Sequence, residues 1–298
     1  MMNDDNGIHT FNRFELKYVI SGQQAQRFKE DLRRYVVPDQ YGDSGRYALS
    51  SLYYDSPDLR CYQENDDGLK LRRKLRIRHY DTGEVFGDES PVCVEIKQRY
   101  DRVTQKRRTV MPYDQALRLC NDRQVPDRAS ADRALWEEIH VFLWRYNLLP
   151  ASIVRYLRQA FMGTAYEQGL RVTFDTSLSF QTQQLHLHES AFGLPLLPAS
   201  MVVMEIKVDE RLPRWLADML AAHNLQQGSI SKYCRSIEVA HRIEMTRRHA
   251  LRAECSRDVL ASCPTTFHAL EERMGIGQEQ RTQEKQDTEV NHGHIQHH

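Results

Sequence analysis

The feature that most constrains the fold of this chain is a succession of eight short segments with the composition of β-strands. Each is rich in β-branched or aromatic residues and is bounded by Gly, Pro, Asp or Ser. In chain order they are RFELKYVI, YALSSLYYDS, KLRRKLRIRHY, PVCVEIKQRY, RVTQKRRTVM, SIVRYLRQAF, LRVTFDTSLSF and MVVMEIKVDE. Helical patterns lie between them and begin after Ser21, at Pro112, after Ser130 and at Pro213. The mixture predicts an α+β fold with an antiparallel sheet.

The third segment, residues 70–80, carries seven basic residues in eleven positions, counting His79. Successive side chains of a strand point to opposite faces. One face therefore carries Lys70, Arg72, Lys74, Arg76 and Arg78, and the other carries Arg73 among apolar residues. Like charges about 6.5 to 7 Å apart repel one another unless an anion lies between them. A solvated strand face is the ordinary interpretation of a basic run, but the sorted charges favour a polyanion site, with Arg73 facing solvent.

A second pattern, Glu-x-Lys, recurs on three of the segments. Its members are Glu15 and Lys17, Glu95 and Lys97, and Glu205 and Lys207. For a single strand, ordinary alternation of apolar and polar faces explains the pattern, and a salt bridge to Lys207 or to a neighbouring arginine would explain Glu205. Eight such strands can instead close into a barrel with helices outside and a ligand inside. A polar lumen of this kind would bind a multiply charged anion, and its carboxylates would hold a divalent metal.

The overall charge limits the possible partners. The 41 Lys and Arg residues equal the 41 Asp and Glu residues, so an anion site must be local, and we expect no nucleic-acid partner. The six cysteines have no metal-type spacing and no signal peptide opens the chain, which predicts reduced thiols and a cytoplasmic location. No apolar run reaches the roughly 20 residues of a membrane span. Residues 1–9 are expected to form a flexible leader and residues 275–298 a disordered polar tail.

From about Phe11 to Glu238, the sequence resembles the VTC domain, the polyphosphate polymerase domain of the vacuolar transporter chaperone family. The resemblance rests on FNRFELKY, LSSLYYDSPDLRCY, KLRIRHY, VEIKQ, VRYLRQAF, LRVTFDTSL, VVMEIKV followed by LPRWLADML, and SISKYCRSI, in that order. It implies a triphosphate tunnel, an eight-stranded antiparallel β-barrel with flanking helices and a basic lumen. The domain would cover residues 10–245, and residues 246–274 would form a C-terminal helical extension.

The resemblance also implies a reaction, in which the γ-phosphate of ATP is added to polyphosphate with Mn²⁺ or Mg²⁺ as the metal. The implied catalytic phosphate ligands are Lys17, Arg76, Arg78, Lys97, Arg155, Arg171 and Lys232. Further substrate contacts would come from Arg13, Lys74, Lys106 and Arg108. The implied metal ligand is Glu205, with Glu15 and Glu95 as additional candidates. The resemblance does not specify whether a membrane protein binds this chain.

The resemblance extends to the superfamily of triphosphate tunnel enzymes, whose hydrolytic members typically carry E-x-E-x-K on the first strand. This chain has Arg13, Glu15 and Lys17 there, so the first glutamate is replaced by a cation. The change weakens the case for activating a water molecule and favours transfer between phosphates. Triphosphate hydrolysis and non-catalytic polyanion sensing remain alternatives. Tyrosines on the strands are explained equally well by packing, so the sequence identifies no adenine site.

Overall fold

The computed structural model describes residues 14–261, except 82, 102, 128–129, 189–192 and 210, and describes residues 249–261 by their backbone alone. The strands are β1 (Phe14–Ser21), β2 (Val36–Pro38), β3 (Arg46–Asp55), β4 (Leu71–Tyr80), β5 (Pro91–Tyr100), β6 (Val103–Pro112), β7 (Leu149–Gly163), β8 (Arg171–Gln181), β9 (Leu194–Pro195) and β10 (Met201–Val208). The helices are α1 (Gly22–Leu32), α2 (Arg60–Asp66), α3 (Tyr113–Cys120), α4 (Arg133–Tyr146), α5 (Arg214–Ala222) and α6 (Lys232–Ala261). The chain divides into two compact units, residues 1–241 and 242–298, and the site lies within the first.

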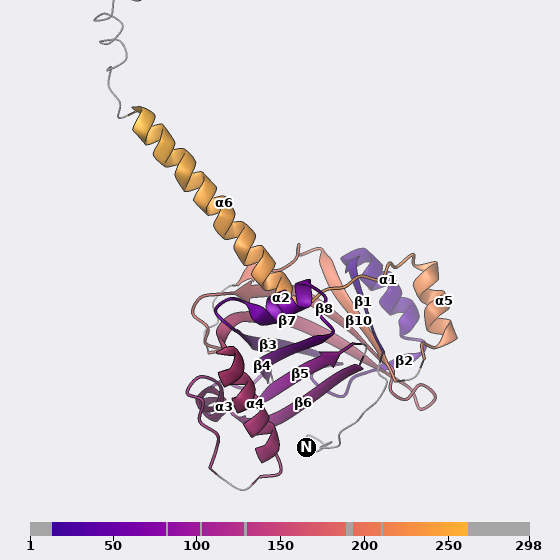
Figure 1. Ribbon diagram of the computed structural model, residues 1–298. Helices are drawn as coiled ribbons and strands as arrows, with labels where there is room; N and C mark the ends of the chain where they lie inside the picture. Colours follow the sequence, from indigo (N-terminus) through magenta and orange to yellow (C-terminus); the bar gives the residue numbers. More distant parts are fainter. Residues whose placement is uncertain are drawn as a thin grey trace, which may run out of the picture. The chain divides into compact units, whose positions relative to one another are not determined.

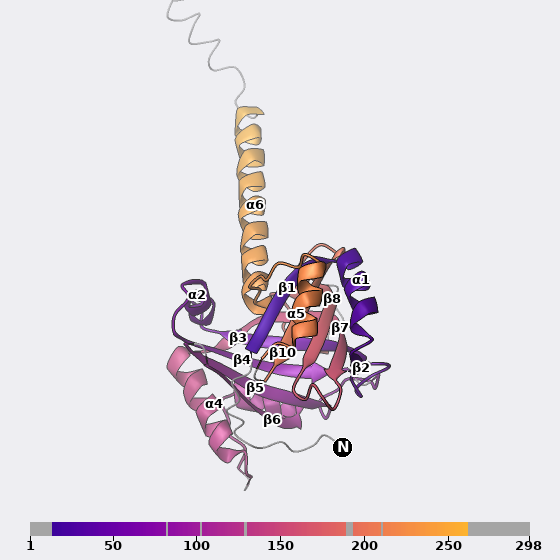
Figure 2. The ribbon, with the colours of Figure 1, turned by 90° about the vertical axis from the view of Figure 1, so that its right-hand side faces the viewer.

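Eight strands form one curled antiparallel sheet, a half-barrel. Their order is β1-β10-β8-β7-β3-β4-β5-β6, and the short strands β2 and β9 pair with β7 and β8. Within the described residues no backbone ladder joins β1 to β6, so the predicted barrel is open along this edge. Figures 1 and 2 show the curl from two directions. We call its concave side the inner face.

Helices cover the convex side because the apolar residues of the strands alternate toward it. Helix α3 contacts β5 and β6, helix α4 contacts β6, and this core includes Leu75, Ile77 and Trp136. Helix α1 contacts β1 and β10, and a second core contains Met204 and Phe174 (Figure 1). The opposite set of side chains, many of them charged, is thereby left on the inner face.

The first turns of α6 fill one end of the inner face. Tyr233 stacks on Tyr53 with 5.2 Å between ring centroids, and its hydroxyl donates to the Asp55 carboxylate at 2.5 Å. This apolar cluster also contains Val154 and Phe180 from the inner face. The inner face is therefore apolar where α6 enters and charged beyond it.

The main elements agree with the sequence. All eight predicted strands are present, and α1 begins at a capping box in which the Ser21 hydroxyl accepts from the Gln24 amide at 3.2 Å. Helix α4 begins at Arg133 rather than directly after Ser130, whose hydroxyl accepts from the Asp132 amide within a preceding turn. Helix α2, strands β2 and β9, and the start of α6 at Lys232 rather than at residue 246 were not predicted. No helix of the described part is long and apolar enough to cross a membrane.

The four cysteines whose side chains the structure describes, Cys61, Cys93, Cys120 and Cys234, are free and buried, as predicted. Burial raises the pKa of Cys61 and of Cys120, and Asp55 adds to the effect at Cys61, while Cys234 Sγ accepts from Lys74 Nζ at 3.2 Å. Thiols of this kind are unreactive packing residues. The expected leader and polar tail lie outside the described residues.

Candidate functional site

Strands β1 and β10 place acids opposite lysines on the inner face. Glu15 is in register with Lys207, and Lys17 is in register with Glu205. Cross-strand pairs of opposite charge contribute roughly 0.2–1 kcal/mol each, so this register is favoured by charge as well as by burial of the other face. The Glu-x-Lys pattern is therefore used twice in one antiparallel pair, with both carboxylates pointing inward.

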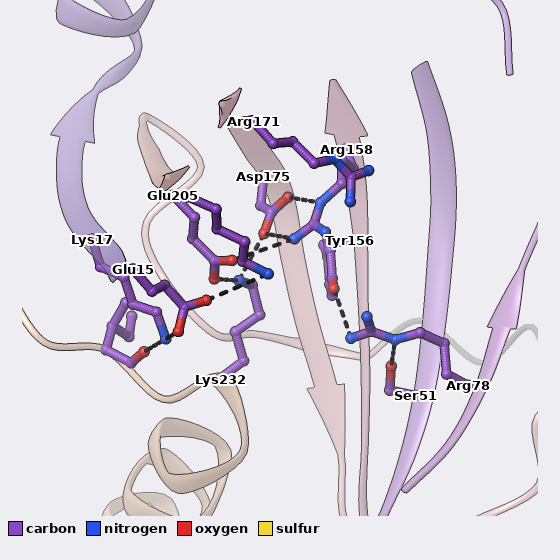
Figure 3. A network of polar contacts seen from close by, with 12 residues as sticks. Glu15, Lys17, Ser51, Arg78, Tyr156, Arg158, Arg171, Asp175, Glu205 and Lys232 are labelled. Atoms are coloured by element: carbon purple, nitrogen blue, oxygen red, sulfur yellow. Dashed lines mark hydrogen bonds and ion pairs between the residues drawn. The ribbon is translucent and has the colours of Figure 1, made fainter. Parts of the chain in front are cut away.

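A buried network of two cations and two carboxylates lies beside this pair. Arg158 of β7 donates from Nε and Nη2 to the two oxygens of Asp175 at 2.7 and 2.8 Å. Lys232, the first residue of α6, lies 2.7 Å from Asp175 Oδ2 and 2.9 Å from Glu205 Oε1. Figure 3 shows Asp175 and Glu205 held between Arg158 and Lys232. The network joins three strands to α6.

Mutual attraction keeps the network ionised despite burial. Burial alone would raise the pKa of Glu205, but Lys232 and Lys17 outweigh it and hold that pKa well below its ordinary range. Asp175 behaves in the same way, since Lys232 and Arg158 lower its pKa against the effect of burial. Burial opposes the charge of Lys232, but Asp175 and Glu205 raise its pKa. All four groups are charged at neutral pH.

Glu15 is surrounded by three lysines. Its carboxylate lies 3.6 Å from Lys17 Nζ, 3.4 Å from Lys97 Nζ and 3.5 Å from Lys207 Nζ. Burial works against ionisation, but the lysines lower the pKa of Glu15 to about 2. Burial lowers the pKa of Lys207 to about 7, although Glu205 and Glu15 act in the other direction. This cluster holds an excess of positive charge around one carboxylate.

A second carboxylate, Glu95 of β5, is fixed between two cations. Arg76 donates from Nε to Glu95 Oε2 at 2.6 Å, and Lys106 Nζ lies 3.0 Å from Oε1. Glu95 is only 1% exposed, yet Arg76 and Lys106 hold its pKa well below its ordinary range against the effect of burial. The Arg76 guanidinium also donates to the Tyr53 hydroxyl at 3.1 Å. Arg76 is therefore oriented by both an acid and a phenol.

Arg78 has a different environment. Its Nε donates to the Ser51 hydroxyl at 3.0 Å and its Nη2 to the Tyr156 hydroxyl at 3.0 Å (Figure 3). It is buried, and no carboxylate of the described residues lies within ion-pair distance of it. A buried guanidinium held by neutral hydroxyls retains unneutralised charge and donors for an anion.

Two buried polar atoms of β8 have no hydrogen-bond partner. Arg171 Nη2 donates to Asp39 Oδ2 and to the Tyr47 hydroxyl, both at 2.8 Å, but its Nε is unpartnered. The hydroxyl of Thr173, two residues further along the inner face, is also unpartnered. Buried polar atoms are normally satisfied, so a water molecule or a ligand atom would complete the hydrogen bonding at these two positions.

The remaining predicted substrate contacts lie apart from one another. Lys74 donates to Asn65 Oδ1 at 3.0 Å and Ser231 Oγ at 2.8 Å, at the end that α6 occupies. Lys106 contacts Glu95, and Arg108 lines a cavity at the other end. Arg13 lies outside the described residues. The predicted set thus extends along the inner face instead of meeting at one point.

Arg155 does not join the inner face. Its Nη1 donates to Gln181 Oε1 at 2.7 Å, and the adjacent residue Tyr156 points inward to Arg78. Arg158 lies three residues after Arg155, so the two side chains point to opposite faces of β7. Arg158 faces inward and contacts Asp175. The structure therefore places Arg158, not Arg155, in the lumen. The motif VRYLRQAF contains both arginines, and strict alternation from Tyr156 would have selected the second.

Arg73 lies on the convex side as predicted, but it is not a solvated charge. Its guanidinium lies 4.3 Å from the ring centroid of Phe142 and 4.9 Å from that of Tyr146, both on α4. Its Nε is buried and unpartnered. Arg73 therefore packs α4 against β4 and is only partly exposed, whereas a fully solvated surface charge was expected.

The three predicted metal ligands do not converge. Glu95 is enclosed by Arg76 and Lys106, and the described residues contain no group of three His, Cys, Asp or Glu that could hold a metal. Glu15 and Glu205 are diagonal neighbours on adjacent strands, and Thr173 with its unpartnered hydroxyl is in register with Glu205. Mg²⁺ is commonly held by one or two carboxylates together with phosphate oxygens and water. Glu15 and Glu205, with Thr173 beside Glu205, are the oxygen donors of the inner face that a divalent metal shared with a phosphate would need, and Glu95 does not belong to that set.

A half-barrel with buried cations on its inner face defines the class of this protein as a triphosphate-tunnel fold. The chain belongs to the VTC domain family, because the model of that family matches residues 12–241. No curated protein sequence matches the chain.

Several solved structures resemble the fold at low sequence identity. A Bacillus halodurans protein provisionally assigned as an adenylate cyclase is 14% identical, with a TM-score of 0.45 over 73% of this chain and 92% of its own. A Hippeastrum adenylyl cyclase candidate described as having a dominant triphosphatase activity is 15% identical, with a TM-score of 0.45 over 74% of this chain and 92% of its own. A Vibrio parahaemolyticus protein is 13% identical, with a TM-score of 0.40 over 76% and 98%.

Proposed function

We propose that this chain is an ATP-dependent polyphosphate polymerase, which transfers the γ-phosphate of ATP to the end of a polyphosphate chain on the inner face. The observation that carries the proposal is the environment of Arg78, a buried guanidinium whose hydrogen bonds go to Ser51 and Tyr156 rather than to an acid. Arg76 is adjacent on the same face, and Arg171 contributes an unpartnered Nε. Such donors suit phosphate oxygens, which accept forked hydrogen bonds from arginine.

The reaction needs positioning and charge neutralisation. A terminal oxygen of the acceptor chain attacks the γ-phosphorus, the bond from that phosphorus to the β–γ bridging oxygen breaks, and ADP leaves with the electron pair. The chain grows by one phosphate, so atoms and charge balance. Phosphoryl transfer through a loose transition state requires in-line alignment more than a covalent nucleophile. The cations of the inner face would hold two mutually repelling anions together.

The phosphate ligands of this proposal come from several strands and α6. They are Lys17, Arg76, Arg78, Lys97, Arg171 and Lys232, with Arg158 in place of Arg155 and with Lys74, Lys106 and Arg108 further out. Lys232 and Arg158 are bound to acids already, so their additional role is to orient Glu205. A Mn²⁺ or Mg²⁺ ion, held by Glu205, Glu15 and Thr173, would neutralise charge on the phosphates and on the leaving ADP.

The environment of Glu15 supports transfer over hydrolysis. Hydrolysis requires a group that prepares a water molecule, and the only described β1 acid is engaged by three lysines. The residue two positions earlier is Arg13 in the sequence rather than a second glutamate. A carboxylate with a pKa of about 2 is a weak base.

The test is incubation of the purified full chain with ATP and Mn²⁺ or Mg²⁺, with and without short polyphosphate, followed by separation of the products by length on a gel. A ladder of species longer than the added phosphates is expected. Orthophosphate without longer chains would identify a hydrolase, and tight polyphosphate binding without turnover would identify a sensor. Either result would overturn the proposal.

A further inference from the structure

A cavity of about 470 Å³ lies where the end of α1 meets strands β2, β3 and β7. We call it the convex pocket. Its lining combines buried apolar side chains with charged ones and includes Arg33, Val36, Asp43, Arg46, Gln159 and Phe161.

The convex pocket lies on the side of the sheet that faces away from the inner face. Arg158 of β7 points inward to Asp175, so the next residue, Gln159, points to the convex side. Gln159 is in register with Arg46 of β3, and its Oε1 accepts from Lys29 Nζ of α1 at 3.3 Å. The sheet therefore separates the pocket from the cations of the inner face.

Three cations gather at the convex pocket without an acid partner. Arg33 and Arg46 line it, and Lys29 reaches it through Gln159. Within the part of the chain that the structure describes, no carboxylate lies within ion-pair distance of any of the three, and the side chains of Arg33 and Arg46 make no hydrogen bond. Their donors are therefore available to a ligand.

The gathering of like charges opposes folding. Lys29 is partly buried; burial lowers its pKa, and the nearby Arg46 and Arg33 lower it further. Cations in the last turn of a helix are stabilised by its dipole, which accounts for Lys29 and Arg33 on α1. Arg46 comes from β3 and gains nothing from that dipole, so its place in the lining needs another explanation.

The charge of the convex pocket fits a doubly charged anion. Asp43 is the one carboxylate of the lining, and against the three cations it leaves a net charge of about +2. Guanidinium groups donate forked hydrogen bonds to tetrahedral oxyanions. A phosphate group carries about two negative charges near neutral pH, so it matches the pocket in charge and in hydrogen bonding.

We infer that the convex pocket binds a small inorganic phosphate anion, with Arg33 and Arg46 donating to its oxygens and Lys29 neutralising its charge. This site is additional to the phosphate ligands of the proposed reaction. It does not depend on that reaction, because none of its residues belongs to the inner face.

The test counts the phosphate sites of the full chain by equilibrium dialysis against labelled pyrophosphate, at constant ionic strength and without metal. Arg33→Gln is expected to raise the Kd of the convex pocket about tenfold, through loss of a charge-assisted contact. Combined with Arg46→Gln, it should remove one bound pyrophosphate per chain. Arg34→Gln is the matched control and should change nothing, because Arg34 is 76% exposed, lies near Asp31 and does not line the pocket.

Two further variants separate the faces and report on structural damage. Arg78→Ala should weaken binding at the inner face and leave the convex pocket filled. Asp43→Asn should tighten the convex pocket, because it removes a repelling charge. Urea denaturation without phosphate should show Arg33→Gln to be at least as stable as wild type, since it relieves repulsion.

The outcomes distinguish this inference from the proposed function. Unchanged binding in the double arginine variant, loss of all binding in Arg78→Ala, or weaker binding in Asp43→Asn would overturn the inference and leave the proposed function standing. A wild type that binds one pyrophosphate, kept in Arg78→Ala and lost in the double variant, would support the inference and count against the proposed function. Absence of binding by the wild type would overturn both.

Discussion

Lys97 on β5 lies 3.4 Å from Glu15 on β1, although β10, β8, β7, β3 and β4 separate these strands in the sheet. The curl of the sheet therefore brings β1, at one edge, within salt-bridge distance of β5, the strand next to the opposite edge. Lys17 and Lys207 surround the same carboxylate. No backbone ladder joins β1 to β6 within the described residues, and ion pairs between side chains bridge this side of the half-barrel instead. Three lysines surround the single carboxylate of Glu15, so the cluster has a net positive charge.

Glu15→Gln should destabilise the protein and strengthen its response to polyanions. The change leaves three lysines around a neutral amide, and we expect the free energy of unfolding to fall by about 1–3 kcal/mol. Tripolyphosphate should restore more stability to the variant than to the wild type, because it supplies the lost negative charge. Urea denaturation with and without tripolyphosphate measures both effects. Glu84→Gln, in an exposed loop, is the control, and equal behaviour of the two variants would contradict the assignment.

Glu95 should account for part of the acid sensitivity of the fold. Its pKa in the folded protein lies well below the ordinary 4.5, so its contribution is fully present above pH 4.5 and is lost as the pH falls through the lowered value. In Glu95→Gln, we expect a loss of about 3 kcal/mol at pH 7, since Arg76 loses a buried partner. The difference from wild type should shrink as the pH is lowered below 4.5. A difference that is constant with pH would show that Glu95 is not ionised by its neighbours.

Arg78 and Arg155 provide a test of the two faces of the sheet. Arg78→Ala should reduce turnover roughly ten- to a hundredfold, because it removes a charge-assisted contact worth about 1.5–3 kcal/mol. Arg155→Ala changes a side chain on the convex side and should leave turnover within about twofold of wild type. Initial rates at saturating ATP, with circular dichroism to confirm folding, measure the contrast. The reverse order of effects would refute the placement of both residues.

Thr173→Val should separate stability from ligand binding. The Thr173 hydroxyl is buried without a partner, and valine keeps the shape and the β-branched character of the strand. We expect the free energy of unfolding to stay level or rise by up to about 1 kcal/mol, while binding of tripolyphosphate with Mg²⁺ weakens. Thr109→Val is the matched control, since Thr109 bonds Asp132 and Trp136 and its loss should destabilise. Destabilisation in both variants would mean that Thr173 has a structural partner.

The strands and their polar faces could be predicted because polar and apolar side chains alternate between neighbouring residues of the sequence. Glu205 and Lys207 alternate with Met204 and Ile206, and the structure puts the two sets on opposite sides. Strands β2 and β9, of three and two residues, are too short to show a period. Helix α2 begins after Leu59 in a left-handed conformation, and the Asp55 carboxylate accepts from its Cys61 amide at 2.7 Å. Such a start depends on tertiary contacts.

The partners within the site could not be predicted because they depend on register. Asp175 meets Arg158 only because β7 and β8 pair with a shift next to Ser177, whose φ is 52°. Arg155 and Arg158 are equally basic in the sequence, and their opposite parity decides which one faces inward. Lys232 reaches Glu205 from a helix that enters the end of the sheet. Nothing in the local sequence of either residue specifies that approach.

The central claim, that the inner face transfers phosphate from ATP to a phosphate chain, is tested most directly by following the phosphorus resonances of one reaction mixture over time. The mixture contains the full chain, ATP, a divalent metal and short polyphosphate. The account predicts that the γ-phosphate signal of ATP declines while ADP and internal phosphates of polyphosphate rise in equal amounts, with orthophosphate constant. A rise of orthophosphate equal to that of ADP, with no new internal phosphates, would contradict it.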